Sequence, residues 1–188
     1  MRLVLLGPPG AGKGTQAKRL AACLGVPAIS TGDIFRSSIA DDSELGRLAQ
    51  SYLDAGKLVP DEVTNDMVRE RISRDDSSPG FVLDGYPRTV AQARALDDML
   101  AELGAHLDRV VELTVDVSEV IKRLLRRAEI EGRSDDTEDV IRHRQEVYLE
   151  QTAPLVDLYR ERSVLVQVDG MGEVDDVTER LTSAVKAG

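Results

Sequence analysis

Short apolar runs alternate with longer stretches of mixed polarity along the whole chain. The runs are three to six residues long and cover Leu3 to Leu6, Ala28 to Ser30, Phe81 to Leu83, Val110 to Val115 and Val164 to Val168. Such runs are typical of buried parallel strands, and the stretches between them are long enough for helical crossovers. We therefore predict an α/β fold with a five-stranded parallel sheet, with ligand-binding residues just after the strand ends.

Helical signals lie between these runs. Ser30 to Asp33 has the pattern of a capping box, and Asp61 to Ile72 and Val90 to Leu103 have the spacing of helices. Thr137 to Arg162 predicts a long helix that Pro154 should kink or interrupt, because proline has no backbone N–H. No repeat or low-complexity linker divides the chain, so we predict a single domain over residues 1–188.

The composition excludes several classes of protein. A chain of 188 residues fits one domain with a sizeable core. Its single cysteine, Cys23, excludes a disulfide framework and a four-cysteine zinc site, and we expect this side chain to pack on an apolar helix face in a reducing cytoplasm. The N-terminal apolar run is too short for a signal peptide and no later run approaches a membrane span, so we expect a soluble protein.

The charge distribution argues against a nucleic-acid partner. The chain has 24 Lys and Arg against 34 Asp and Glu, and the net charge of −10 repels a phosphate backbone. Against this acidic background, Arg123, Arg126, Arg127 and Arg133 form a local basic cluster. Taken alone, the cluster fits either a solvated helix face or a site for an anionic ligand.

A glycine-rich loop follows the first apolar run directly. It reads Gly7-Pro8-Pro9-Gly10-Ala11-Gly12-Lys13-Gly14-Thr15 and leads into a helical pattern through Leu24. Glycines let backbone N–H groups approach phosphate oxygens, the start of a helix favours negative charge, and Lys13 can reach the β- and γ-phosphates. The context predicts a nucleotide-binding loop rather than a turn with a surface lysine. Gly14 stands where serine or threonine is usual, which leaves open whether Thr15 binds magnesium.

Further motifs follow this loop in a fixed order. They are Ser30-Thr31-Gly32-Asp33-Ile34-Phe35-Arg36, Gly56-Lys57-Leu58-Val59-Pro60, Asp84-Gly85-Tyr86-Pro87-Arg88-Thr89, Gln92, and Gly132-Arg133-Ser134-Asp135-Asp136 followed by Arg144. Together with the loop they resemble the nucleoside monophosphate kinases and, among these, the adenylate kinase family of short-lid bacterial type. Many ATPases and kinases share such a loop, whereas the ordered set is specific to this family and covers essentially the whole chain.

The resemblance implies an architecture and an activity. It implies a P-loop three-layer α/β fold with strand order 2-3-1-4-5, an AMP-binding segment at 30–59 and a short lid at 126–136 that carries no zinc. It also implies reversible phosphoryl transfer from magnesium-bound ATP to AMP, which gives two ADP and serves adenine nucleotide homeostasis. The family is usually monomeric, so we expect a cytoplasmic monomer whose partners are ATP, AMP and ADP.

The same resemblance assigns residues to the two nucleotides. Those expected at ATP are Gly10, Ala11, Gly12, Lys13, Gly14, Thr15, Arg123, Arg127 and Gly172. Those expected at AMP are Thr31, Arg36, Lys57, Leu58, Val59, Gly85, Tyr86, Pro87, Arg88, Gln92, Arg133 and Arg144. Guanidinium groups bind phosphate oxygens bidentately, and the amide of Gln92 offers both a donor and an acceptor to adenine.

Charge stabilisation is expected to come from a subset of these residues. Lys13, Arg88, Arg133 and Arg144 are the expected catalytic residues. Asp84, at the end of a predicted strand, is the expected magnesium ligand, through water, with Asp33 as a weaker second candidate. No general base is expected, since the phosphate of AMP is already ionised at neutral pH.

Two alternatives remain at this point. One is a kinase of the same scaffold that takes UMP, CMP or GMP as acceptor, although Thr31 and Gln92 favour AMP. The other is a regulatory module that binds ATP without catalysis. The presence of Arg36, Arg88, Arg133 and Arg144 argues against the second alternative.

Overall fold

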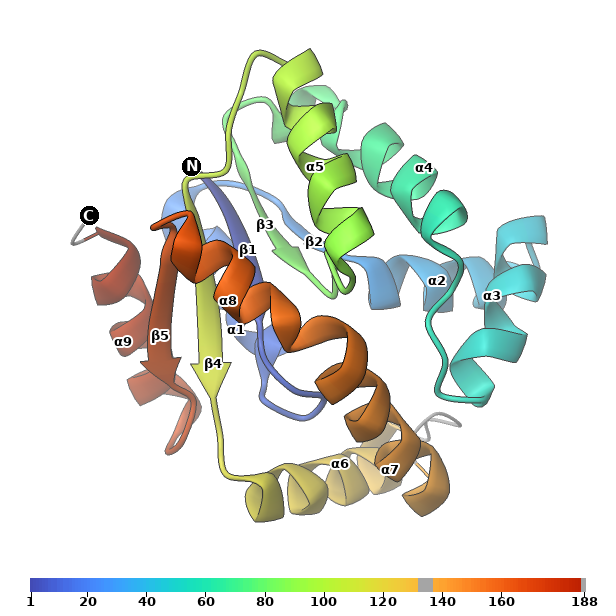
Figure 1. The fold of residues 1–188 in the computed structure, drawn as a ribbon. Helices are drawn as coiled ribbons and strands as arrows, with labels where there is room; N and C mark the ends of the chain where they lie inside the picture. Colours follow the sequence, from blue (N-terminus) through green and yellow to red (C-terminus); the bar gives the residue numbers. More distant parts are fainter. Residues whose placement is uncertain (132–136, 187–188) are drawn as a thin grey trace.

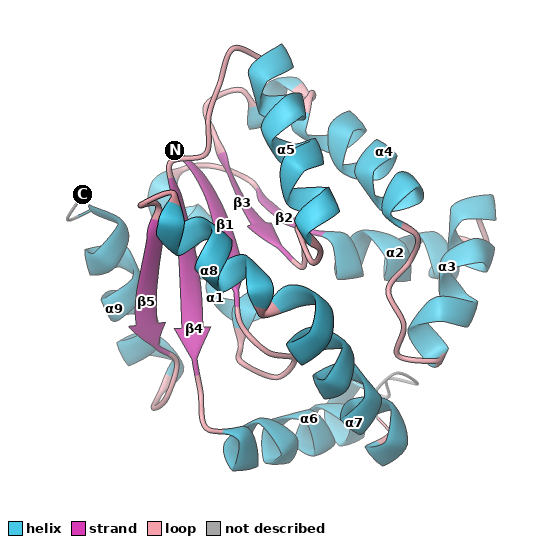
Figure 2. Ribbon diagram, viewed as in Figure 1, coloured by secondary structure: helices cyan, strands magenta, loops and turns pink. Residues whose placement is uncertain are grey.

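The computed structural model describes residues 1–131 and 137–186 and has a single parallel sheet at its centre (Figures 1 and 2). Its strands are β1 (Arg2–Leu6), β2 (Ala28–Ser30), β3 (Phe81–Asp84), β4 (Arg109–Thr114) and β5 (Leu165–Asp169). They pair in the order β2-β3-β1-β4-β5 with every pairing parallel. The predicted strands and strand order are therefore confirmed, with boundaries that differ by at most one residue at either end.

Helices connect the strands and cover both faces of the sheet (Figure 1). The described α-helices are α1 (Lys13–Leu24), α2 (Thr31–Ala40), α3 (Glu44–Asp54), α4 (Asp61–Ile72), α5 (Val90–Glu102), α6 (Val117–Glu131), α7 (Glu138–Val147), α8 (Pro154–Glu161) and α9 (Val174–Lys186). A 3-10 turn, η1 (Asp75–Ser77), precedes β3, and a π-helical segment, η3 (Tyr148–Thr152), joins α7 to α8. None of the described helices is both long and apolar enough to cross a bilayer.

Alternation along β1 separates two apolar cores. Val4 and Leu6 pack into a cluster with residues of α4, α5 and α8, whereas Leu3 and Leu5 pack into a cluster with residues of α1 and α9. Side chains on a strand point alternately to opposite faces, so this fully buried strand contributes to both layers. The result is the predicted three-layer arrangement.

The predicted interruption of the C-terminal helix is present, but its form differs from a simple proline kink. The chain leaves α7 through the π-helical segment η3, and Pro154 then occupies the first position of α8. Proline is tolerated there because the first N–H of a helix has no intrahelical acceptor. Helices α7 and α8 and the segment between them form one bent rod across the front of the molecule (Figure 1). We refer to residues 138–161 as the α7–α8 rod.

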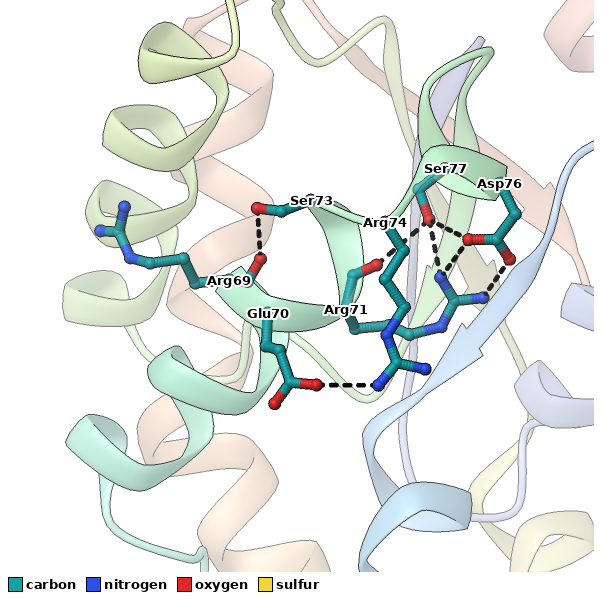
Figure 3. A network of polar contacts seen from close by, with 7 residues as sticks. All are labelled: Arg69, Glu70, Arg71, Ser73, Arg74, Asp76 and Ser77. Carbon is teal, nitrogen blue, oxygen red and sulfur yellow. Dashed lines mark hydrogen bonds and ion pairs between the residues drawn. The ribbon is translucent and has the colours of Figure 1, made fainter.

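The connection from α4 into strand β3 is fixed by a polar network (Figure 3). Arg71 donates to both carboxylate oxygens of Asp76, at 2.9 and 2.8 Å, and to Ser77 Oγ at 2.7 Å. Arg74 pairs with Glu70 at 2.8 Å one turn earlier. The guanidinium of Arg71 holds the pKa of the Asp76 carboxyl below its usual range. Because Ser77 is buried, this network fixes the turn from which β3 starts.

Candidate active site

A deep cleft opens at the C-terminal ends of the strands, where a parallel sheet is expected to bind its ligands. We call it the main cleft; its volume is about 1110 Å³, including the part open to solvent. It is lined by Pro9, Gly10, Gly12, Lys13, Gly14, Thr15, Lys18, Ser30, Gly32, Asp33, Arg36, Asp84, Gly85, Arg88, Arg123, Leu124 and Arg144. The cleft therefore joins motifs from across the sequence, and its lining is dominated by cations and backbone amides.

The glycine-rich loop connects β1 to α1 and is seated on α6. Gly10 has a φ of +87°, and a Cβ added there would lie 2.9 Å from Leu124 Cγ, so only glycine allows the loop to pack this closely on α6. Helix α1 begins at Lys13, and its N-cap residue, Gly12, offers no side chain to the first N–H groups of the helix. These N–H groups face a region where an anion is favoured by the helix dipole.

Lys13 lies over the loop that precedes it. Its Nζ atom donates to the carbonyl oxygens of Gly7 and Pro8, at 2.7 and 2.9 Å. Carbonyl groups are neutral acceptors, so the contacts orient the ammonium group without neutralising its charge. A phosphate group at the loop would add an anionic acceptor for the same group.

Four arginines reach the main cleft from four different elements or loops. They are Arg36 of α2, Arg88 after β3, Arg123 of α6 and Arg144 of α7. Arg36 pairs with Asp33 at 2.6 Å, the Nε atom of Arg88 donates to the carbonyl of Gly85 at 2.8 Å, and Nη1 of Arg123 donates to the carbonyl of Gly170 at 3.2 Å. The arrangement suits a ligand with several phosphate groups.

Two carboxylates stand among these cations. Asp84 ends β3 and is 9% exposed, and its Oδ2 atom accepts from Ser30 Oγ at 3.4 Å. Asp33 pairs with Lys18 at 3.2 Å as well as with Arg36. Burial opposes the charge on Asp33, but hydrogen bonds from Arg36 and Lys18 outweigh it, and the pKa of this carboxyl is lowered. Both side chains place carboxylate oxygens in the main cleft, where they could act as ligands of a cation.

A smaller pocket of about 330 Å³ adjoins the main cleft, and we call it the second pocket. It is lined by Thr31, Gly32, Phe35, Leu53, Lys57, Leu58, Val59, Thr64, Gly85, Arg88 and Gln92. The amide of Gln92 is held at both ends: Nε2 donates to Asp61 Oδ1 at 2.7 Å, and Oε1 accepts from the backbone N–H of Arg88 at 2.7 Å. Each end of the amide keeps one further hydrogen-bonding position, which can read one edge of a ligand.

Comparison with known proteins identifies the family. A family model described as adenylate kinase matches residues 5–164. The chain is 61% identical over 185 residues to an adenylate kinase of Kocuria rhizophila, with 98% of each chain covered, and 60% identical to one of a Nocardioides species, with 98% and 97% covered. It is 57% identical over 187 residues to an adenylate kinase of Thermobifida fusca, with 100% and 99% covered. The chain belongs to the adenylate kinase family.

The structure brings most of the predicted site residues of this adenylate kinase family member together. The main cleft and second pocket contain most of the residues expected at both nucleotides from the glycine loop and all of those expected from α2 and from Lys57 to Val59, together with Gly85, Arg88 and Gln92. Leu58 and Pro87 line a further cavity of about 520 Å³ next to the main cleft, which we call the side cavity. Thr15 lies in the main cleft with Asp84.

Three expected residues do not line the clefts as predicted. Tyr86 is fully buried, and its hydroxyl donates to Asn65 Oδ1 at 2.7 Å, so its side chain belongs to the core and supports the neighbouring motif from below. Ala11 is 2% exposed, and its N–H donates to Pro8 O inside the loop. Gly172 lies in the loop between β5 and α9 and is not among the lining residues of the three cavities described above. A motif match gives the position of a residue but not the direction of its side chain.

Part of the predicted lid falls outside the described residues. This applies to Gly132 to Asp136, and therefore to Arg133, Asp135 and the expected role of each. The backbone of Arg127 belongs to α6, but its side chain is also outside the described part of the chain. The assignments of Arg127 and Arg133 remain predictions from the resemblance.

Other residues in or around the site were missed by sequence reasoning. Lys18 lines the main cleft and pairs with Asp33; it follows Lys13 on the same helix, which was the available signal. Asp61 holds the amide of Gln92, and Gln145 and Thr152 bond to the two nucleotide motifs. The residues in these contacts are between 31 and 136 positions apart in sequence, so no local sequence pattern indicates them.

Proposed function

We propose that the chain catalyses reversible phosphoryl transfer from magnesium-bound ATP to AMP, giving two ADP, and so serves adenine nucleotide homeostasis. The observation that carries the proposal is the union of the glycine loop and four arginines in one cleft with a second pocket beside it. A loop alone suits any nucleoside triphosphate. A separate, arginine-flanked pocket with a buried amide suits an acceptor that is itself a nucleotide.

The donor would lie along the glycine loop. The N–H groups at the start of α1 and the ammonium group of Lys13 would hold its β- and γ-phosphates, and Arg123 and Arg127 would cover its outer part. The acceptor would lie in the second pocket, with its phosphate between Arg36 and Arg88 and its base at Gln92. Thr31 and Lys57 to Val59 would line the walls around its sugar and base.

Transfer would proceed without a protein base. The second pKa of a phosphate monoester is about 6, so the attacking oxygen is already ionised at neutral pH. The enzyme then contributes alignment and charge: Lys13, Arg88 and Arg144, with Arg133 from the lid, would stabilise the charge on the equatorial oxygens of the transferred group. One such arginine can contribute about 10³ to 10⁵ in rate.

The oxygen donors in the main cleft fit a magnesium ion. Asp84 and Thr15 line the cleft beside the loop, with Ser30 and Asp33 nearby. Magnesium prefers oxygen ligands and usually keeps several waters, so one or two carboxylates suffice when substrate phosphates complete the shell. We assign Asp84 to hold these waters; the ion, when bound, would supply positive charge that offsets the charge of the transferred phosphoryl group. Among the described residues, no group of three or more His, Cys, Asp or Glu side chains is placed to hold another metal.

We further propose residues 30–59 as the AMP-binding segment and residues 126–136 as the short lid of a cytoplasmic monomer. Closure of both over bound nucleotides would exclude water, which would otherwise accept the phosphoryl group and hydrolyse ATP. We propose no nucleic-acid or membrane partner, in keeping with the net charge of −10.

The experiment that tests the function separates products by ion-exchange chromatography. Purified protein is incubated with magnesium-ATP and each of AMP, UMP, CMP and GMP. We expect ADP formation with AMP alone, and formation of ATP and AMP from ADP in the reverse direction. Turnover of UMP, CMP or GMP instead would move the acceptor assignment to a related kinase. The absence of any transfer, with ATP still bound, would favour a regulatory module and overturn the proposal.

A further inference from the structure

Two side chains of the α7–α8 rod bond to the two motifs that handle phosphate. The Nε2 atom of Gln145 donates to the carbonyl oxygen of Pro9 in the glycine loop at 3.1 Å. The Oγ1 atom of Thr152 donates to the carbonyl oxygen of Arg88 at 2.9 Å. The rod runs across the strand ends between these motifs (Figure 1), so one element contacts both halves of the site.

Arg88 is held by other side chains at both its backbone N–H and its backbone carbonyl. The N–H of Arg88 donates to Gln92 Oε1 at 2.7 Å, and its carbonyl accepts from Thr152. Thr152 is 7% exposed and its bond to Arg88 is partly buried, so removal of its hydroxyl would leave a partly buried carbonyl with one donor fewer. The main-chain position of Arg88, and with it the origin of the guanidinium group, therefore depends on Thr152.

Between the two contacts the rod forms one wall of the side cavity. Arg144, Tyr148 and Thr152 line this wall, and Pro9 and Arg88 line the walls contributed by the two motifs. Arg144 also lines the main cleft. The two bonding residues are seven positions apart in one continuous helical stretch, with Gln145 in α7 and Thr152 at the end of η3. A hydrogen-bonded helix of this length is a stiff spacer.

We propose that Gln145 and Thr152 are positioning residues that set the distance between the glycine loop and Arg88. This inference rests on the proposed function, because that distance matters only if a phosphoryl group passes from one motif to the other. In-line transfer requires the attacking oxygen and the phosphorus to be aligned, and a misplacement of about 1 Å can cost about 10²-fold in rate. Neither residue needs to touch a substrate; each acts through a backbone carbonyl.

The main test uses Thr152→Val, which keeps the shape and removes the hydroxyl, and Thr152→Ser, which restores it. Wild-type ADP formation from AMP is measured first, and its absence would refute the proposed function rather than this inference. For Thr152→Val we expect kcat to fall at least tenfold, while calorimetric Kd values for ATP and AMP change less than twofold. Thr152→Ser should return kcat to within threefold of wild type. Thr182→Val, on α9, is the matched control and should leave kcat unchanged.

Gln145→Leu provides the second arm at a partly exposed position, where the substitution is easier to accommodate if Thr152→Val does not fold. Its control is Gln151→Leu, at an exposed position of the same rod. We expect at least a threefold fall in kcat for Gln145→Leu alone. The fold-decrease in kcat of the double variant should be smaller than the product of the two single decreases, because the first substitution already removes one of the two contacts that fix the distance. A kcat within threefold of wild type for both single variants, a failure of Thr152→Ser to rescue, or weakened nucleotide binding in proportion to the fall in kcat would overturn the inference.

Discussion

Replacement of Gly85 by alanine tests the close packing on which the acceptor motif depends. Gly85 has a φ of +79°, and an added Cβ would lie 2.8 Å from Thr31 Oγ1 and 3.1 Å from Arg88 Nη2. Ordinary contacts begin at 3.4 Å, so Thr31 would have to move by about 0.6 Å and Arg88 by about 0.3 Å. Thr31 is buried, and its hydroxyl donates to the carbonyl of Gly85 at 3.0 Å, so this movement would also distort that hydrogen bond.

The expected loss of stability follows from these two effects. A side chain in the left-handed region costs about 1–2 kcal/mol, and loss of a hydrogen bond costs about 0.5–1.5 kcal/mol. Alanine also lowers the conformational entropy of the unfolded variant, which offsets about 0.4–1 kcal/mol of this loss of stability. We expect a net loss of about 2 kcal/mol in the free energy of unfolding, which for a chain of this length is a fall of about 4–8 °C in Tm. Displacement of Arg88 should lower kcat by about 10-fold or more.

The assay measures thermal unfolding and ADP formation for Gly85→Ala and for Gly104→Ala. Gly104 also has a positive φ, +63°, but nothing lies within 4 Å of an added Cβ, so it isolates the backbone cost from the clash. Gly104→Ala should lose about 1 kcal/mol and keep wild-type kcat. Adding Thr31→Ala to Gly85→Ala should relieve the contact and recover part of the stability. If Gly85→Ala loses no more stability than Gly104→Ala and keeps its kcat, the packing argument is wrong.

Three further predictions concern charged and buried groups. Lys13→Ala should lower kcat by about 10³-fold without changing the unfolding midpoint by more than a few degrees, measured by product analysis and thermal melting. The lowered pKa of Asp33 gives the folded state a stability contribution that is present above the unfolded pKa of about 3.9 and is lost as pH falls through the lower folded pKa, so the deficit of Asp33→Asn in urea unfolding should shrink as pH falls below about 5. Burial, with a further contribution from Glu112, raises the pKa of Tyr148 to about 12, so Tyr148→Phe should remove a late step from an ultraviolet titration.

The sheet was predictable mainly because β1 and β3 are almost entirely buried on both faces. Such strands read as continuous apolar runs, and β1 and β3 are flanked by loops whose glycine and proline residues end them sharply. The order of the strands required the family resemblance, since apolar runs carry no information about which strand lies beside which. The capping of α2 was also readable: Ser30 Oγ accepts from the N–H of Asp33, a contact within four residues.

Side-chain direction was the part that sequence could not supply. Cys23 was expected to pack on an apolar helix face and is exposed, whereas Tyr86 was expected at the nucleotide and is fully buried. The polar residues that hold the site are Asp61 at the start of α4, Gln145 in α7 and Thr152 in η3, and none of them belongs to a motif that the sequence shows. Their roles come from contacts across the fold, and a pattern of local spacing does not contain such contacts.

The arrangement of charge explains how an acidic protein can bind polyanions. The net charge is −10, yet the main cleft gathers Lys13, Arg36, Arg88 and Arg123. Each of these side chains donates to an acceptor of the protein itself. For Lys13, Arg88 and Arg123 the acceptors described above include neutral carbonyl groups, so replacing them by phosphate oxygens exchanges a weak partner for a charged one. For Arg36 the partner is Asp33, and binding there must compete with an existing ion pair. Arg123 also pairs with a carboxylate, that of Glu119, at 3.3 Å. Affinity for phosphate at Arg36 and at Arg123 should therefore rise when the paired carboxylate is neutral, an effect that a count of charges does not show.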